Sequence, residues 1–345
     1  MCHLRAGAQI LRVGRRSHTF PSANSLWTSG TIHHPVIWVD TRVLSGALIS
    51  FGGTPYRAGF GEARLPEGSI TGLPLSRLSI NQATVREQWD LSELIGNVAA
   101  LGIGGIAPWR DKLAITGVEK ARQEIRTAGL RVSSLCRGGM FPAETTPQRQ
   151  AAIDDCLRAI DEAAAIGAEA LVIVAGGLPA GSKDIAGARS MVVAGLEAAL
   201  PHARACGIPL AIEPLHPMYA ADRACINTLH QANDLCDHLG DGVGVIVDVY
   251  HLWWDPALEH EIQRASGRIL GFHISDWLVP TRHMLLDRGM MGDGIIDVAK
   301  IWNWVAATGY DGLIEIEIFS VEDWWTKPGE IVLQTCVDRF RTCLG

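Results

Sequence analysis

The segment VGVIVDVYHLWWD, residues 243–255, decides the fold. Its first five residues, 243–247, are apolar and mostly β-branched, which is typical of a strand buried on both faces. Asp248 stands at the end of this strand, and His251 follows three residues later. Strands buried on both faces occur in parallel sheets that helices cover, and an acid and an imidazole at such a strand's end indicate a functional site.

The same pattern continues from residue 78 to the end of the chain. Apolar runs alternate with segments rich in Ala, Leu, Glu and Arg, of which 148–167 and 297–309 have helical spacing and end on Gly. Strands followed by helices imply parallel pairing, because a parallel crossover needs about a dozen residues. The sequence therefore predicts an α/β fold, a (β/α)₈ TIM barrel. Its strands are expected at 77–85, 102–109, 131–136, 170–177, 209–214, 243–249, 269–275 and 312–319.

Composition and charge limit the class of protein. Apolar residues make up 48% of the 345 residues and charged residues 19%, which is typical of a globular protein. The net charge of −7 argues against a nucleic acid partner. No apolar run is long enough to span a membrane, and no G-x-G-x-x-G motif follows the first strand. The eight cysteines lack C-x-x-C spacing, which indicates reduced thiols and a cytoplasmic location.

The first 76 residues are expected to form an irregular N-terminal extension that adds no strand to the barrel of 77–345. Residues 1–39 contain four Arg and no Asp or Glu, a composition that organelle transit peptides share. The favoured interpretation is a poorly ordered extension, since the stretch is rich in Gly, Ser, Thr and His and lacks helical periodicity.

Four consecutive strands of the predicted barrel end in side chains that can bind a metal. Strands five to eight carry, in order, Glu213, Asp248, His273 and the pair Glu315 and Glu317. The carboxyl ends of barrel strands lie at one rim, so these side chains are expected to meet. Ionised groups in an apolar mouth are unfavourable unless they are paired or bind a cation, and few Lys or Arg accompany these strand ends. One divalent ion is the expected partner: Mn²⁺ first, with Mg²⁺, Co²⁺ or Zn²⁺ as alternatives.

The last strand offers two carboxylates, Glu315 and Glu317. They have the same parity, so both should point into the barrel. Glu315 would lie about 7 Å deeper along the strand, which favours Glu317 as the ligand. A buried pair with an Arg or Lys is the alternative interpretation of Glu315.

From about residue 78 onward, the sequence resembles the xylose isomerase-like superfamily of sugar isomerases and epimerases. The resemblance rests on IEPLHP, DVYH, FHISD, MMGDGIID and GYDGLIEIEI, which occur in the family's order. It implies that Glu213, Asp248, His273 and Glu317 bind one Mn²⁺-type ion. It also implies that His251 contacts substrate oxygens, and that Glu213 and Glu317 are the catalytic acid/base pair acting through an enediolate.

The implied function is a metal-dependent isomerase or epimerase of a ketose or keto-sugar. Tyr219 and Val279 stand where ketose epimerases have a substrate-binding Glu and Arg, so the sugar contacts must differ. A lyase or dehydratase on a keto-sugar or cyclitol is the alternative, because it uses the same enolate chemistry. A non-catalytic sugar-binding barrel is a third hypothesis, against which the complete ligand set argues. No phosphate-binding glycine loop with a Lys is present, which favours an unphosphorylated substrate.

Endonuclease IV belongs to the same superfamily but needs more histidines. The chain has no histidine between His34 and His202, and its counterpart of the D-R-H triplet, residues 287–289, reads Asp-Arg-Gly. A three-metal phosphodiesterase site cannot be built in the same way.

Other polar side chains near the predicted rim are candidate substrate contacts. For those after the second and third strands, loop packing and a solvated charge are equally good interpretations. For His216, in the motif IEPLHP, the alternative interpretation is a structural turn histidine. Two arginines after the seventh strand could replace the missing family arginine. Together with His251, the candidates are Trp109, Arg110, Arg137, His216, Arg282 and Arg288.

Two further expectations concern residues behind the rim. Asp276 is expected to orient a ligand or a substrate hydroxyl. Six tryptophans are expected to pack in the core or at a subunit interface, which is compatible with a homo-oligomer: Trp253, Trp254, Trp302, Trp304, Trp324 and Trp325.

Overall fold

The segment that decides the fold lies inside a parallel sheet. Strand β7 (Val243–Asp248) is buried along its length and pairs in parallel with β6 (Leu210–Ile212) and β8 (Ile269–Ile274). The computed structural model describes residues 72–344. Residues 72–76 contain no strand, whereas the rest of the predicted extension lies outside the described residues.

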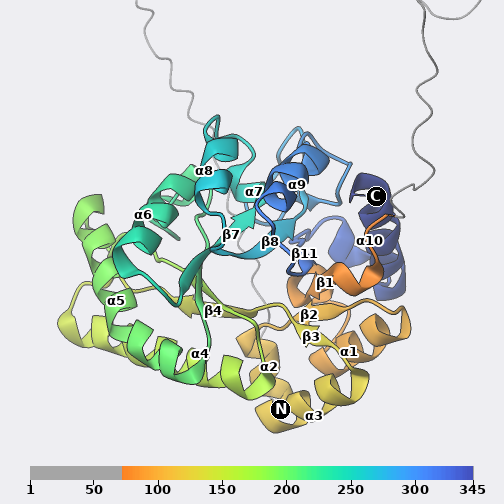
Figure 1. The fold of residues 1–345 in the computed structure, drawn as a ribbon, viewed down its shortest axis with the longest axis horizontal. Helices are drawn as coiled ribbons and strands as arrows, with labels where there is room; N and C mark the ends of the chain where they lie inside the picture. Colours follow the sequence, from red (N-terminus) through yellow and green to blue (C-terminus); the bar gives the residue numbers. More distant parts are fainter. Residues whose placement is uncertain (1–71, 345) are drawn as a thin grey trace, which may run out of the picture. The chain divides into compact units, whose positions relative to one another are not determined.

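Nine parallel strands follow one another around the barrel in the order β3-β2-β1-β11-β8-β7-β6-β5-β4. β3 and β4 are two pieces of the predicted third strand, and a bridge joins Trp109, two residues after β2, to Cys136 in β4. All eight predicted strands are present, and the TIM barrel is confirmed (Figure 1). The remaining strands are β1 (Leu78–Asn81), β2 (Gly105–Ala107), β3 (Arg131–Val132), β4 (Leu135–Gly139), β5 (Leu171–Val174) and β11 (Ile314–Ile316).

Helices surround the strands, as Figure 1 shows. The predicted helix at 148–167 begins two residues earlier, at a capping box between Thr145 and Gln148, and ends at Gly167 in the left-handed conformation. The α-helices are α1 (Leu91–Ala100), α2 (Arg110–Thr116), α3 (Val118–Ala128), α4 (Thr146–Ile166), α5 (Ile185–Cys206), α6 (Leu229–Leu239), α7 (Val249–Leu252), α8 (Leu258–Arg264), α9 (Val298–Ala307) and α10 (Gly329–Leu344). The 3₁₀ helices are η1 (Leu75–Arg77), η2 (Gln82–Val85), η3 (Pro217–Tyr219) and η4 (Trp324–Thr326). No helix in the described part of the chain is long and apolar enough to cross a membrane.

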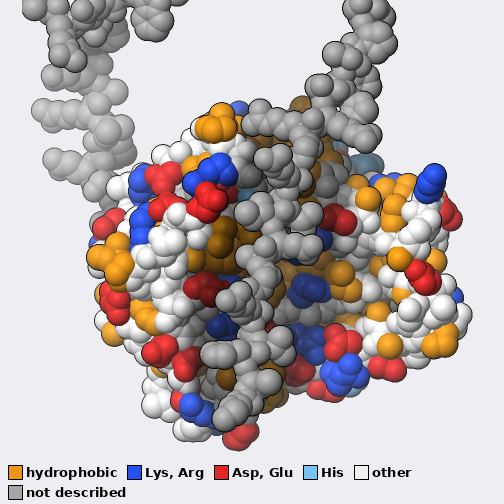
Figure 2. Space-filling model, turned by 180° about the vertical axis from the view of Figure 1, so that it is seen from behind, with side chains coloured by type: hydrophobic (Ala, Val, Ile, Leu, Met, Phe, Trp, Pro, Cys, Tyr) orange, Lys and Arg blue, Asp and Glu red, His pale blue; other side chains and the backbone are white. Residues whose placement is uncertain are grey.

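A short hairpin between β8 and α9 brings additional side chains to the barrel. Its antiparallel strands are β9 (Asp276–Trp277) and β10 (Arg288–Gly289). Two hydrogen bonds fix the loop between these strands. The Tyr219 and Tyr250 hydroxyls donate to the Met284 carbonyl, at 2.7 and 2.8 Å. Seen from behind, one face of the molecule is hollowed, with apolar and charged side chains set deep in it (Figure 2).

Candidate metal and substrate site

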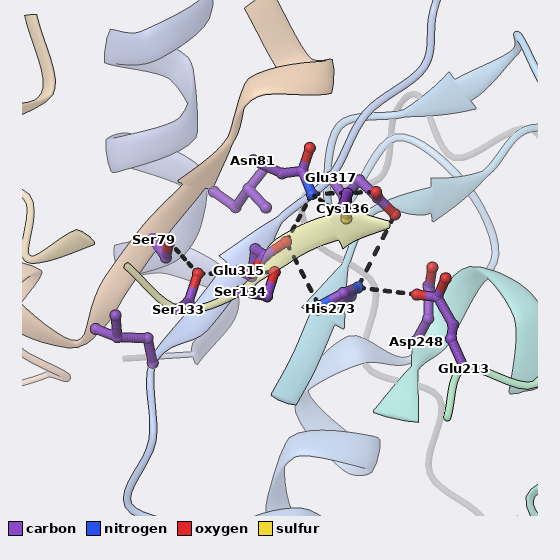
Figure 3. A network of polar contacts seen from close by, with 12 residues as sticks. Ser79, Asn81, Ser133, Ser134, Cys136, Glu213, Asp248, His273, Glu315 and Glu317 are labelled. Atoms are coloured by element: carbon purple, nitrogen blue, oxygen red, sulfur yellow. Dashed lines mark hydrogen bonds and ion pairs between the residues drawn. The ribbon is translucent and has the colours of Figure 1, made fainter. Parts of the chain in front are cut away.

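Four side chains from neighbouring strands form one buried cluster, named here the four-residue cluster. Glu213 follows β6, Asp248 ends β7, His273 lies in β8 and Glu317 follows β11. One ligand atom from each lies within 4.8 Å of the others, and all four residues are buried. Figure 3 shows them approaching from adjacent strand ends. The structure therefore brings together the four residues that the strand ends predicted, while their role as metal ligands stays a prediction.

His273 has carboxylates at both ring nitrogens. Its Nδ1 lies 3.0 Å from Glu213 Oε1 and 3.9 Å from Glu317 Oε2, and its Nε2 lies 3.4 Å from Glu315 Oε1. Burial opposes protonation, but the negative charges of Glu315, Glu213 and Glu317 outweigh it and raise the pKa of His273 to about 10. Nδ1 is therefore the ring atom that faces the other members of the cluster.

Glu315 lies behind His273 in a shell of neutral donors. Its Oε1 accepts a hydrogen bond from Asn81 Nδ2 at 2.6 Å, and its Oε2 accepts one from Ser133 Oγ at 2.7 Å (Figure 3). An Arg or Lys partner, the alternative considered for this residue, is not found among residues 72–344. Metal-binding histidines commonly donate their second N–H to a carboxylate. Glu315 Oε1 lies 3.4 Å from His273 Nε2 without forming a hydrogen bond, so Glu315 is placed to hold the ring by its charge.

Glu315→Gln should weaken Mn²⁺ binding by about 10–100-fold, since His273 would lose the charge that fixes its ring. Isothermal titration of the metal-free protein with Mn²⁺ measures this. Ser79→Ala is the control, because it alters the same buried network without touching Glu315. The Ser79 hydroxyl lies 2.8 Å from the Ser133 hydroxyl, which in turn binds Glu315. Unchanged Mn²⁺ affinity in the Glu315 variant would show that His273 is oriented by other groups.

Arg288, on β10, supplies one positive charge to the cluster. Its Nη1 donates to Asp248 Oδ2 and to Glu317 Oε2, both at 3.1 Å, and its Nη2 lies 3.2 Å from His251 Nε2. The expectation that few basic groups accompany the strand ends overlooked this side chain, which reaches the cluster from the hairpin. Burial opposes its charge, but Asp248 and Glu317 raise the pKa of Arg288 above its usual range.

The donor set fits a divalent cation. Counting Glu315, four carboxylates face one guanidinium and one protonated imidazole, so negative charge remains in excess where water has little access. Burial raises the pKa of Glu317 to about 8. The negative charges of Glu213 and Asp248 act in the same direction, and the positive charges of Arg288 and His273 oppose the shift. Carboxylate oxygens and one imidazole are the ligands that Mn²⁺, Mg²⁺, Co²⁺ and Zn²⁺ share.

A cavity of about 340 Å³ opens beside the cluster at the carboxyl ends of the strands, and is called the barrel cavity. This volume is within the range of about 300–1,000 Å³ typical of small-molecule sites. Glu213 and Glu317 line it, and so do four of the predicted substrate contacts: Trp109, Arg137, His251 and Arg288. Its other walls are largely apolar and include Val174, Leu215 and Phe319.

His251 is a buried member of this wall. Its Nε2 lies 3.7 Å from Asp248 Oδ2, and its Nδ1 has no hydrogen-bond partner among the described residues. Burial, together with the charge of Arg288, holds the pKa of His251 well below its usual range. The imidazole is therefore neutral, and its Nδ1 is a buried nitrogen without a partner among the described residues.

Three predicted substrate contacts lie away from the barrel cavity, each for a local reason. Arg110 points to α4, where it binds Asp155 at 2.8 Å and Glu162 at 2.6 Å. His216 accepts a hydrogen bond from Met218 N–H and stacks on Trp277, as in the alternative interpretation as a turn histidine. Arg282 makes ion pairs with Asp287 and Glu322.

Asp276 binds the backbone of a neighbouring loop, and its expected role toward a ligand or substrate stays a prediction. Its carboxylate accepts hydrogen bonds from the backbone N–H groups of Gly292, Gly294 and Ile296, at 2.8–3.0 Å. It therefore holds the loop after β10 and has no contact with the four-residue cluster.

Asn81, at the end of β1, is a site residue that the sequence analysis missed. Its Nδ2 donates to Glu315 and Glu317, and its Oδ1 accepts a hydrogen bond from Trp109 Nε1 at 2.8 Å. The signal was present, because Asn81 is a polar residue at the carboxyl end of an apolar strand, like the predicted ligands.

The chain belongs to the xylose isomerase-like TIM barrel family, whose model matches residues 95–335. Protein SMc04130 from Sinorhizobium meliloti 1021 is 57% identical over 78% of this chain and 99% of its own, with a TM-score of 0.77. The IolI protein, solved with a zinc atom, is 19% identical over 78% of this chain and 98% of its own, with a TM-score of 0.69. The 3-keto-D-glucoside 4-epimerase YcjR from E. coli is 21% identical over 77% of this chain and 98% of its own, with a TM-score of 0.62.

Comparison with curated proteins gives no match. The resemblance inferred from the sequence motifs is confirmed by the family match. The structural neighbours include sugar epimerases. At their low identities these neighbours share the fold, so the reaction has to be argued from the site.

Proposed function

We propose that this protein is a metal-dependent isomerase or epimerase of a keto-sugar. The observation that carries the proposal is the four-residue cluster, in which three carboxylates and an imidazole meet beside a cavity of small-molecule size. Mn²⁺ is the proposed ion, with Mg²⁺, Co²⁺ and Zn²⁺ as alternatives. The structure of the IolI protein, which shares the fold, was solved with a zinc atom, which supports a metal in this barrel.

Glu213 and Glu317 are the proposed proton carriers. A divalent ion, when bound, supplies a Lewis acid that polarises a carbonyl oxygen and acidifies the neighbouring C–H. The two glutamates come from separate strands and both line the barrel cavity. One carboxylate removes the proton next to the carbonyl, and a carboxylate on the other side returns a proton to the resulting enediolate.

The remaining wall residues are proposed to position the sugar. His251 offers a neutral ring nitrogen to a hydroxyl, Trp109 can cover an apolar sugar face, and Arg288 keeps Asp248 and Glu317 in place. The polar groups would thus orient the substrate while the apolar wall limits access of water.

A lyase or dehydratase on a keto-sugar or cyclitol is the second candidate, and one observation favours it. Tyr219 and Val279 occupy the positions of two substrate-binding residues of ketose epimerases. The Tyr219 hydroxyl is used in binding the Met284 carbonyl, and Val279 is 69% exposed. Neither side chain replaces the missing Glu or Arg, so the substrate is held differently.

Incubation with a panel of keto-sugars in D₂O tests the proposed function. Proton NMR of the Mn²⁺-loaded protein should show loss of the signal of the proton beside the carbonyl, with an epimer or isomer appearing. A new unsaturated product would identify a lyase instead. The absence of both exchange and product across the panel would refute a catalytic barrel of this kind.

Two further proposals concern the chain as a whole. The cysteines within residues 72–344 are free thiols, which supports a cytoplasmic location. We also propose that the barrel of 77–345 is the domain that carries the function.

A further inference from the structure

Two arginines of the barrel cavity have no acidic partner among residues 72–344. Arg137 lies on β4, Arg223 lies between η3 and α6, and both line the cavity that Glu213 and Glu317 also line. Neither guanidinium makes an ion pair or a side-chain hydrogen bond with the described residues. The nearby Arg288, in contrast, binds two carboxylates.

The two groups differ in burial, because Arg223 is exposed at the rim of the cavity and Arg137 lies deeper, where the surroundings are unfavourable for positive charge. Arg137 is half-buried, and burial lowers its pKa, as do the like charges of Arg223 and Arg110. Asp222 lines the same cavity but lies more than 4.0 Å from both guanidinium groups. A half-buried charge without a partner is costly, and it is retained where a ligand of opposite charge binds.

The backbone fixes the loop that carries Arg223. Leu178 N–H donates to the Ala221 carbonyl at 2.7 Å, which joins this loop to the end of β5. A Cβ at Gly177 would lie 2.5 Å from the same carbonyl and 2.8 Å from Arg223 N, so only glycine permits so close an approach. The position of Arg223 beside the cavity is therefore a feature of the packed fold.

We propose that the substrate carries a terminal oxyanion, a carboxylate or a phosphate, that Arg137 and Arg223 bind while its keto end reaches Glu213 and Glu317. This inference rests on the proposed function and narrows its substrate class to sugar acids or sugar phosphates. Guanidinium groups match the planar geometry and charge of such oxyanions. A neutral sugar would leave both positive charges without a partner.

Binding of matched sugars tests the inference. The full chain is loaded with Mn²⁺, freed of unbound metal, and titrated calorimetrically with the D-2-ketohexoses, their C6 carboxylic acids and their 6-phosphates. Each set shares carbons one to five and differs only at the sixth. At least one charged form should bind about 10–100-fold more tightly than its neutral parent, as expected for charge-assisted hydrogen bonds. The carboxylate and phosphate arms show which oxyanion it is.

Two variants separate this site from general electrostatics. Arg137→Gln combined with Arg223→Gln should bring the affinities for the charged and neutral forms to within about 2-fold of each other. Arg126→Gln removes the same charge from an exposed position on α3 and should leave the preference unchanged.

The outcomes distinguish the two proposals. Equal affinity of charged and neutral forms in the unaltered protein overturns the oxyanion site alone and leaves the proposed function standing. A preference that survives in the double arginine variant also overturns it. If no ketohexose, acid or phosphate binds, both the oxyanion site and the proposed function fail.

Discussion

Glu317→Gln should lower turnover of the keto-sugar by about 10²–10⁴-fold, the range typical of lost general acid–base catalysis. The substitution keeps the shape of the side chain and one carbonyl oxygen but removes its charge and basicity. Glu317 Oε2 lies 3.1 Å from Arg288 Nη1 and 3.9 Å from His273 Nδ1, so Mn²⁺ affinity should fall as well. Steady-state kinetics and elemental analysis of the purified variant measure the two effects.

His251→Asn is the matched variant, because His251 lies beside the cluster without being part of it. We expect a higher KM or a lower kcat, with Mn²⁺ content unchanged. Equal loss of Mn²⁺ in the Glu317 and His251 variants would place His251 among the ligands and contradict its role as a substrate contact.

Removal of the metal should have the second large effect. Chelation with EDTA followed by gel filtration should abolish turnover, since the buried carboxylates lose the cation that balances them. A ligand at a thousandfold excess over its Kd stabilises the folded state by about 4 kcal/mol. For a barrel of this size, the melting temperature should fall by roughly 5–10 °C on chelation and recover when Mn²⁺ is returned.

A second, partly exposed group of possible metal ligands could also bind the added ion, so the melting measurement needs a control. Asp161, His202 and Cys206 also bring ligand atoms together, on the outer helices α4 and α5. The melting experiment is therefore repeated in His202→Asn, where the metal-dependent shift should persist, and in Asp248→Asn, where it should be lost. A shift that disappears in the His202 variant alone would assign the stabilising metal to the helices.

The sequence was sufficient to predict the fold and the four-residue cluster for a definable physical reason. Strands buried on both faces are continuous apolar runs, so their ends are visible, and barrel geometry places all the carboxyl ends at one rim. Asp248 and His273 could be located from this rule alone. Glu317 was preferred over Glu315 because it lies nearer the mouth of the barrel, and the structure places Glu317 in the cluster and Glu315 behind it.

The other contacts depended on packing that no local pattern encodes. Arg288 reaches the cluster because β9 and β10 pair, and the two strands are separated by an irregular loop. Arg110 was predicted at the rim, but in the fold its side chain pairs with Asp155 and Glu162 of α4. Arg223 had no signal in the sequence, since its position follows from the close contact of its loop with the end of β5.

The central claim is that Glu213, Asp248, His273 and Glu317 hold a divalent ion. Anomalous diffraction from crystals grown with Mn²⁺ tests it most directly. One strong anomalous peak is expected about 2.0–2.4 Å from an oxygen or nitrogen of each of the four side chains. A map without a peak in the cluster, from crystals whose Mn²⁺ is visible elsewhere on the same molecule, would contradict the account.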